Sequence, residues 1–301
     1  EPRTVYGYTA PQDRNVTTYV MEHHQRSGIG NTVIMQYMLD WFRLPSAFEN
    51  NLWLSQILQG MAMKYAVEHW RRAMPRGMGT LYWQLNDCWP VASWASLDYH
   101  KRWKALHYMA KGFYAPLLVS GVEDAKTGQV DVHVTSDLLE AKAVDFRWKL
   151  FNVQGTLLAE DGRSLTAPAL ANTLVETVDL SAYLQQAGPR DLLLHLALQA
   201  EGETVSSNLV LFARPKHLEL AEPGITATVR AAGEGCWEIL LGTEKPALWV
   251  WLELADARFS DNFFHLLPGM VKRVGVSMAA GLSERDVLEQ LRVSSLVDSY
   301  A

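Results

Sequence analysis

Apolar side chains in the first 115 residues recur at helical spacing. From Asn31 they fall three and four positions apart until Pro45 ends the run. Runs of the same period extend from about 47 to 73 and from 104 to 114. The pattern therefore predicts three helices, whereas the polar, proline-bearing residues 1 to 20 indicate a loop.

Beyond Pro116 the period changes to the alternation of strands with one buried face. The first set of predicted strands covers 130–134, 144–153, a stretch from 156, 173–178, 192–198 and 208–214. About a hundred residues of short strands with turn signals are typical of an immunoglobulin-like sandwich. A second set covers 225–229, 237–241, 248–254 and 271–276, with a boundary near 214 to 218. Ser283 is expected to cap a short helix. The strand tryptophans are expected to be buried or to lie at domain contacts, and they are Trp148, Trp237, Trp249 and Trp251.

The stretch Gly79 to Leu85 is apolar, aromatic and threonine-bearing, and it predicts a buried strand. Its end changes abruptly to indoles, amides and a carboxylate, at Trp83, Gln84, Asn86, Asp87 and Trp89. Such groups suit a sugar pocket, because indole faces cover the apolar side of a pyranose while amides and carboxylates bind its hydroxyls. The alternative is that they close the end of a sheet by packing and local hydrogen bonds, and composition alone does not separate the two.

Length and charge narrow the function classes. With 301 residues and 49% hydrophobic content, the chain is long enough for two or three domains. A formal net charge of −6 gives no basic footprint for nucleic acid, and no apolar run is long enough to cross a bilayer. We therefore expect neither nucleic acid nor a membrane as a partner.

Metal and disulfide sites are not expected. Cys88 and Cys236 fall in different predicted domains, so a disulfide framework is not indicated. The adjacent His23 and His24 cannot easily share one ion, and no carboxylate pattern completes a ligand set. We place both histidines in a loop near the rim of a pocket and predict no metal and no cofactor.

Several motifs together resemble one family. The run YWQLNDCWPVASWASLDYHKRWKALHYMAKGFYAP at 82 to 116 is similar to the eighth strand and following helix of the catalytic barrel of β-mannosidases in glycoside hydrolase family 2. The resemblance extends to HHQRSGIGN at 23 to 31, SQILQGMAMKYAVEHWRR at 55 to 72 and FSDNFFHLLPG at 259 to 269. It implies a multidomain chain of α/β and all-β parts, with the C-terminal part of a (β/α)8 barrel followed by two immunoglobulin-like β-sandwiches. The expected domains are 1–116, 117–215 and a smaller one at 216–301.

The resemblance implies a retaining exo-β-mannosidase, a glycoside hydrolase that removes terminal, non-reducing β-D-mannose. The family carries its two catalytic glutamates in an Asn-Glu pair and a Ser-Glu-Phe-Gly type sequence, and neither motif occurs in these 301 residues. We expect both glutamates upstream of Glu1, so this chain contains no catalytic residue. The upstream half of the same enzyme is then an expected partner, since without it the barrel residues expose apolar faces. Glu68, beside Arg71 and Arg72, is expected to form an ion pair on the helix face or at a domain contact.

The same resemblance implies substrate-binding roles for four residues. Trp83 matches the tryptophan that forms the apolar floor under the non-reducing sugar. Asn86 and Asp87 follow it as groups that bind hydroxyls or orient the site. Trp89 is placed on the aglycone side or in packing next to Pro90. The expected ligand is a β-mannoside oligosaccharide.

Alternative functions stay open. Another activity of the family is possible, an exo-β-glucosaminidase or an endo-β-mannosidase, although the run from Trp83 to Asp87 favours the mannosidase. The chain could also be a non-catalytic carbohydrate-binding or scaffold piece, because sandwich folds host many functions. Such a module would carry its aromatic residues on sandwich loops, whereas here they gather before Pro116. The compartment is unknown, with a periplasmic or secreted location favoured over the cytoplasm.

Overall fold

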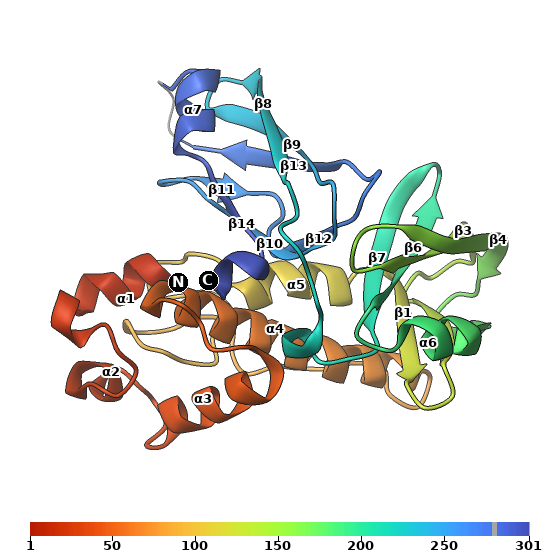
Figure 1. The fold of residues 1–301 in the computed structure, drawn as a ribbon, viewed down its shortest axis with the longest axis horizontal. Helices are drawn as coiled ribbons and strands as arrows, with labels where there is room; N and C mark the ends of the chain where they lie inside the picture. Colours follow the sequence, from red (N-terminus) through yellow and green to blue (C-terminus); the bar gives the residue numbers. More distant parts are fainter. Residues whose placement is uncertain (279–281, 301) are drawn as a thin grey trace. The chain divides into compact units, whose positions relative to one another are not determined.

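The structure, a computed structural model, describes residues 1–278 and 282–300 (Figure 1). It divides into two compact units. The first comprises Glu1–Asn152 and Leu157–Leu218, and the second comprises Val153–Thr156 and the residues from Glu219 onward. Each unit is described by itself below.

The first unit opens with helices. These are α1 (Pro2–Tyr8), the 3-10 turn η1 (Pro11–Asp13), α2 (Tyr19–His23), α3 (Gly30–Trp41), α4 (Phe48–Arg72) and α5 (Ala105–Phe113). The three helices predicted from apolar spacing are α3, α4 and α5, and all are confirmed. Helices α4 and α5 lie side by side and share an apolar cluster that includes Val67, Leu106 and Phe113.

The prediction of a loop over residues 1 to 20 is wrong, because capping overrides the polar composition. The Glu1 side chain accepts a hydrogen bond from the Arg3 backbone nitrogen, and Pro2 occupies the first turn of α1, where proline is tolerated. Thr18 caps α2 through its side chain. His23 consequently ends a helix rather than lying in a loop, and His24 is its C-cap.

The predicted buried strand at 79 to 85 is also wrong. No hydrogen-bonded strand forms there within the described part of the chain, and the segment makes only isolated bridges further on, such as Asn86 with Leu97. A strand requires a neighbour that completes its backbone hydrogen bonds, and among the described residues only the carbonyls of Gln84 and Leu85 accept such bonds here, from the Ser96 and Leu97 nitrogens. Leu81 and Trp83 are instead 100% and 74% exposed.

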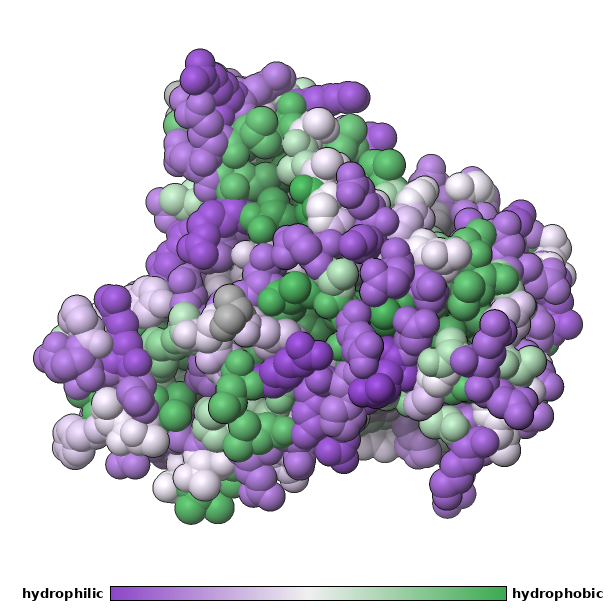
Figure 2. Space-filling view, in the orientation of Figure 1, coloured by the Kyte–Doolittle hydropathy of each residue, from purple (hydrophilic) through white to green (hydrophobic). Residues whose placement is uncertain are grey.

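The helical part leaves further large apolar side chains at the surface. Ile29, Tyr37, Leu39 and Leu44, in and around α3, are each about half exposed or more. Figure 2 shows hydrophobic side chains reaching the surface in this region among hydrophilic neighbours. Open apolar side chains of this kind suit contact with another part of a protein.

A β-sandwich of two antiparallel sheets completes the first unit (Figure 1). One sheet has the order β1-β2-β5 and the other the order β4-β3-β6-β7. The strands are β1 (Leu117–Asp124), β2 (Gln129–Ser136), β3 (Lys142–Asn152), β4 (Leu157–Ala167), β5 (Ala171–Asp179), β6 (Leu192–Ala200) and β7 (Glu203–Leu211). Inward-facing side chains of both sheets fill the core, where Phe146, Leu150 and Leu194 have no exposed surface.

The predicted strands of this sandwich are confirmed, and the structure adds two elements. Strand β1 begins with four consecutive buried residues, so it lacks the alternation by which the others are recognised. The short helix α6 (Ser181–Ala187) has no side-chain cap and no buried residue. After β7 the turn η2 (Pro215–His217) leads to the end of the unit.

Helix α4 docks on the sandwich through buried polar groups. Glu68 is only 2% exposed, and its Oε1 accepts a hydrogen bond from Asn208 Nδ2 of β7 at 2.9 Å. Lys64, one turn earlier, lies 3.2 Å from the same oxygen and donates to Asn208 Oδ1 at 2.8 Å. Asn208 also donates to the carbonyl of Val119 on β1. The prediction that Glu68 forms a helix-face or domain-contact ion pair is confirmed, with Lys64 as its partner.

The second unit is a smaller pair of antiparallel sheets. Their orders are β11-β13-β9-β8 and β12-β10-β14. The elements are β8 (Thr226–Gly233), β9 (Cys236–Gly242), β10 (Ala247–Glu253), β11 (Arg258–Phe259), β12 (Phe264–Leu266), β13 (Lys272–Ser277), α7 (Glu284–Gln290), β14 (Arg292–Ser294) and η3 (Val297–Ser299).

The helix cap, the strands and the buried tryptophans predicted for this unit are confirmed. Ser283 caps α7 in a capping box, in which its hydroxyl accepts from the Asp286 backbone and the Asp286 carboxylate accepts from the Ser283 backbone. The predicted strands correspond to β8, β9, β10 and β13. The tryptophans expected to be buried are buried here, at Trp237, Trp249 and Trp251, and Trp148 of the first sandwich is partly buried.

Candidate functional site

The candidate site is built on residues 77 to 104, an irregular stretch between α4 and α5 that we call the wall segment. Its exposure alternates from Thr80 to Leu85 with the period of a strand. Tyr82 points to the helices and packs on the cluster of α4 and α5. Leu81, Trp83 and Leu85 point the other way and are 100%, 74% and 55% exposed. The segment therefore has one face packed on the helices and one open apolar face, which runs from Leu81 through Trp83 to Leu85.

After this face the chain turns inward at a carboxylate. Asn86 is exposed and its amide donates to the Asp87 carbonyl at 3.2 Å. Asp87 is buried, with 6% exposure, and its Oδ1 accepts a hydrogen bond from the Ser93 hydroxyl. The other carboxylate oxygen, Oδ2, is buried without a hydrogen-bond partner among the described residues. A buried oxygen of this kind requires a neighbouring positive charge or a bound polar group.

A buried lysine supplies the positive charge. Lys104, the residue before α5, is 6% exposed and donates to the Ser93 carbonyl at 3.1 Å. Burial lowers the pKa of Lys104 to about 8, and the charges of Asp87 and Asp98 act against this shift. Burial also raises the pKa of Tyr8, with the Asp87 charge adding to the effect. Tyr8, the last residue of α1, and Lys104, the last residue of the wall segment, thus both lie within the electrostatic influence of Asp87.

A second carboxylate ties the wall segment to α1. Asp98 is 3% exposed, and its Oδ2 accepts from the Thr4 hydroxyl at 2.5 Å. Its Oδ1 accepts from the Arg102 backbone nitrogen at 2.9 Å. The Arg102 guanidinium donates back to the Thr4 hydroxyl at 2.8 Å. These bonds hold the loop that follows Asp87 in a defined shape.

A third tie joins the wall segment to the end of α2. His24 Nδ1 lies 2.5 Å from the carbonyl of Pro90, and the Ala92 backbone nitrogen donates to the His24 carbonyl at 2.8 Å. Trp89, immediately before Pro90, is partly exposed and packs against both His23 and His24. The histidine pair therefore lies against the wall segment.

The structure sorts the four sequence-predicted site residues into two kinds. Trp83, Asn86 and Trp89 are exposed or partly exposed, so a ligand can touch them. Asp87 is buried, so it can affect a ligand only through the segment that it holds in place. Residues that the sequence did not single out are Thr4, Tyr8 and Lys104. Only the proximity of α1 reveals the first two, and nothing in the sequence distinguishes Lys104 from a surface lysine.

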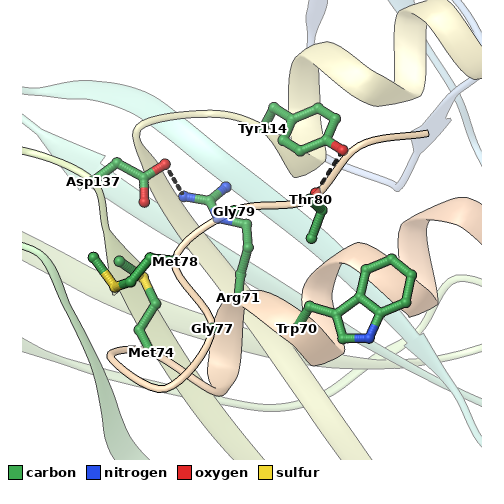
Figure 3. Close-up of a pocket in the computed structure, with 9 residues that line it drawn as sticks. All are labelled: Trp70, Arg71, Met74, Gly77, Met78, Gly79, Thr80, Tyr114 and Asp137. Carbon is green, nitrogen blue, oxygen red and sulfur yellow. Dashed lines mark hydrogen bonds and ion pairs between the residues drawn. The ribbon is translucent and has the colours of Figure 1, made fainter.

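A small cavity lies at the start of the wall segment (Figure 3). Its volume is about 60 Å³, and it is lined by Trp70, Arg71, Met74, Gly77, Met78, Gly79, Thr80, Tyr114 and Asp137. Its polar groups bind one another: Arg71 pairs with Asp137 at 2.9 Å and Thr80 Oγ1 lies 2.7 Å from the Tyr114 hydroxyl. The cavity is far smaller than a ligand pocket, for which about 300 Å³ is a lower bound, and it contains none of the predicted site residues.

The described residues hold neither a metal-binding cluster nor a disulfide. Among the described residues no group of three or more His, Cys, Asp or Glu side chains could hold a metal ion. Cys88 and Cys236 are free and exposed. Among those same residues, no helix has the length and apolar content needed to cross a membrane.

Comparison with known families identifies both β-sandwiches. Residues 128–217 match the model of a mannosidase Ig/CBM-like domain, and residues 220–299 match an Ig-fold domain. Both sandwiches are therefore immunoglobulin-like, as the sequence predicts.

Relatives extend the similarity across the chain. Beta-mannosidase A of Aspergillus fumigatus is 33% identical over 266 residues, which are 81% of this chain and 28% of that protein. Beta-mannosidase A of Aspergillus oryzae is 30% identical over 298 residues, or 91% of this chain and 32% of that protein. The chain thus spans about a third of the length of these relatives.

Two solved structures are similar to nearly the whole chain. A β-D-mannosidase from Dictyoglomus thermophilum matches 98% of this chain with a TM-score of 0.89 and 25% identity, and the match covers 36% of that protein. An exo-chitosanase from Amycolatopsis orientalis matches 98% of this chain with a TM-score of 0.77 and 18% identity, and covers 40% of that chain. The second match shows a shared fold.

Proposed function

Because this chain belongs to the β-mannosidases of glycoside hydrolase family 2, we propose that it forms one wall of the sugar pocket in a retaining exo-β-mannosidase. The substrate of the complete enzyme is a terminal, non-reducing β-D-mannose residue. The chain corresponds to the C-terminal part of its relatives, and the activity belongs to the longer protein.

The open face of the wall segment carries this proposal. In a (β/α)8 barrel each strand points alternate side chains into the barrel and out to the helices. The alternation from Thr80 to Leu85, with Tyr82 on the helices and Trp83 exposed, fits a last barrel strand whose neighbours lie outside this chain. Helices α3, α4 and α5 then belong to the outer layer. Trp83 lies toward the carboxyl end of that strand, the end at which barrel enzymes have their active sites.

The chemistry requires two carboxylates that this chain does not supply. A retaining glycosidase uses a nucleophile and an acid/base about 5 to 5.5 Å apart. No motif of the family's catalytic glutamates occurs in the sequence, and Asp87 is buried against Ser93 and Lys104 rather than open to a glycosidic bond. Both glutamates are therefore assigned to the upstream half of the enzyme.

The four site residues take distinct roles in this proposal. Trp83 presents its indole as the apolar floor under the non-reducing mannose. Asn86 is exposed beside it and can bind a hydroxyl. Asp87 is buried and orients the site by holding the turn through Ser93. Trp89 lies further out, on the side of the leaving group.

The test is Trp83→Ala in the complete enzyme, assayed on 4-nitrophenyl β-mannoside. We expect kcat/KM to fall at least ~100-fold, since a misplaced sugar loses alignment with the catalytic groups. Trp70→Ala is the matched control, because Trp70 is 46% exposed on α4 and lines only the small cavity. Proton NMR of the first product should show the β-anomer, as retention requires.

Other outcomes identify the competing functions. Hydrolysis of a β-glucosaminide without hydrolysis of β-mannosides would assign the enzyme to another activity of the family. Binding of manno-oligosaccharides without hydrolysis of any glycoside would favour a carbohydrate-binding role. Residues 1 to 301 alone are expected to be inactive and poorly soluble, because the open face of the wall segment has no partner.

A further inference from the structure

A buried serine makes hydrogen bonds to the residues that flank Trp83. Ser96 has no exposed surface, and its backbone nitrogen donates to the Gln84 carbonyl at 3.0 Å. Its hydroxyl donates to the next carbonyl, that of Leu85, also at 3.0 Å. The same hydroxyl lies 2.9 Å from the hydroxyl of Tyr82. Ser96 is therefore bonded to the chain on both sides of Trp83.

The hydrogen-bonding capacity of the Ser96 hydroxyl is fully used. A carbonyl can only accept, so the single proton of the hydroxyl goes to Leu85. The two lone pairs of its oxygen then accept from the Tyr82 hydroxyl and from Nδ1 of His107, which lies 3.0 Å away. Burial and the nearby charge of Lys111 lower the pKa of His107, so the neutral ring carries its proton on Nδ1. Loss of the serine hydroxyl would deprive all three groups of a partner.

Helix α5 holds Ser96 in place. His107 lies in the first turn of this helix and packs edge-on against Trp103, with ring centroids 4.4 Å apart. Lys104, the residue before the helix, donates its backbone nitrogen to the Ser96 carbonyl at 3.0 Å. The helix thus fixes Ser96 through its side chain and its backbone, and Ser96 in turn fixes the two residues that follow Trp83.

The direction of the Trp83 indole depends on these bonds. The side chain is 74% exposed, so its own contacts cover little of it. Tyr82, before it, packs on the helices with its ring stacked on that of Tyr114, and the carbonyl of Gln84, after it, is held by Ser96. A backbone that is fixed on both sides of an extended residue fixes where its side chain points.

Resting on the proposed function, we propose that Ser96 is a positioning residue for the sugar site. Together with Tyr82 and His107 it holds the backbone around Trp83, so that the indole lies flat under the non-reducing sugar. Ser96 touches no substrate, because it is fully buried. It acts on the reaction through Trp83, so its effect on hydrolysis should vanish when the indole is absent.

The experiment is a double-mutant cycle in the complete enzyme, assayed as kcat/KM on 4-nitrophenyl β-mannoside. Ser96→Ala alone is expected to lower kcat/KM about 10-fold, because a displaced sugar loses alignment with the catalytic groups. In a Trp83→Ala background the same substitution should lower kcat/KM less than ~2-fold, since the two residues act as a unit. Tyr82→Phe removes one hydroxyl and keeps the ring, and it should show the same pattern with a fall of about 3-fold.

A matched control separates positioning from a general loss of stability. Ser206 of β7 is 7% exposed, and its hydroxyl accepts from the Val119 backbone nitrogen at 3.1 Å. Ser206→Ala therefore removes a buried, bonded serine hydroxyl from the first sandwich, and kcat/KM should stay at the wild-type value. Urea denaturation of each variant shows that the assayed enzyme is folded. If Ser96→Ala does not fold, Tyr82→Phe takes its place in the cycle.

The cycle also separates this inference from the proposed function. Equal falls on Ser96→Ala with and without Trp83 would overturn the inference, because the serine would then act independently of the indole. A Ser96→Ala enzyme with wild-type kcat/KM would overturn it too, provided that Trp83→Ala alone causes its large loss. A Trp83→Ala enzyme that keeps wild-type kcat/KM would instead overturn the proposed function itself.

Discussion

The first sandwich and the wall segment belong to the same compact unit, yet they are stabilised in opposite ways. The sandwich buries apolar side chains between two sheets, and the backbone groups of its strands pair with one another. The wall segment exposes Leu81 and Trp83 and buries charged groups instead, at Asp87, Asp98 and Lys104.

The two regions differ in where the residues that complete their packing lie. A sandwich contains both halves of its core, so its fold follows from its own residues. The wall segment has its polar side tied to α1 and α2 and its apolar side open. We infer that the open side is completed by residues outside this chain, whereas the hydrogen bonds to α1 and α2 form within it.

The largest expected effect is on the stability of the first sandwich. Phe146→Ala on β3 removes a side chain with no exposed surface from the centre of the sandwich core. The lost burial and the cavity left behind should lower the free energy of unfolding by ~3–5 kcal/mol, measured by urea denaturation. Leu139→Ala is the control: that side chain is 83% exposed, and its loss should change stability by less than ~0.5 kcal/mol.

A slightly smaller effect is expected where α4 meets the sandwich. Glu68→Ala leaves Lys64 and Asn208 without their buried partner, and should lower the free energy of unfolding by about 3 kcal/mol. Glu160→Ala removes the surface partner of Lys149, a pair in which both side chains are more than a third exposed, and should cost less than ~1 kcal/mol. Equal costs for the two variants would contradict the buried role of Glu68.

An effect of acid is expected in the first sandwich. Burial lowers the pKa of His195 on β6 to about 4, with the cross-strand Lys149 adding to the shift. Between pH 6.5 and pH 4 the unfolded chain therefore binds a proton that the folded chain does not, so stability falls as the pH is lowered through this window. Urea midpoints at several pH values should show this fall, and His195→Gln should reduce it.

The smallest expected effect is on stability when an exposed side chain of the wall segment is removed. Leu81→Ala should change the stability of residues 1 to 301, measured on the fraction that stays in solution, by less than ~0.5 kcal/mol, because the side chain is fully exposed. In the complete enzyme the same substitution should cost ~2 kcal/mol or more, since a barrel interior would bury it. Identical small effects in both proteins would contradict the assignment of 79–85 to a barrel strand.

These regions also differ in how well the sequence predicts them. Apolar spacing predicts α3, α4, α5 and most sandwich strands, and Ser283 predicts the start of α7. Those elements carry their own signal, because the residues that stabilise them lie within the element or beside it in the same sheet. The four site residues were chosen from a motif, and the structure finds three of them accessible.

Other features follow from distant contacts and leave no local signal. The stretch 79–85 has the composition of a strand, but a ladder requires a paired neighbouring strand, and none forms beside it among the described residues. Lys104 and Asp98 are buried because α1 covers the wall segment, which neither residue indicates alone. Helix α1 itself depends on a cap at Glu1 and a proline in its first turn, within a stretch whose composition indicates a loop.

The bond between Glu68 and Asn208 has a consequence for recombination between relatives. Chimaeric enzymes are commonly cut where one domain ends, which here would be near Pro116. Such a crossover would combine an α4 from one parent with a sandwich from another, and a mismatch at either position would leave a buried carboxylate or amide unpaired. A crossover placed before α4 would instead inherit Lys64, Glu68 and Asn208 together, so the helix and the sandwich are best treated as one exchangeable module.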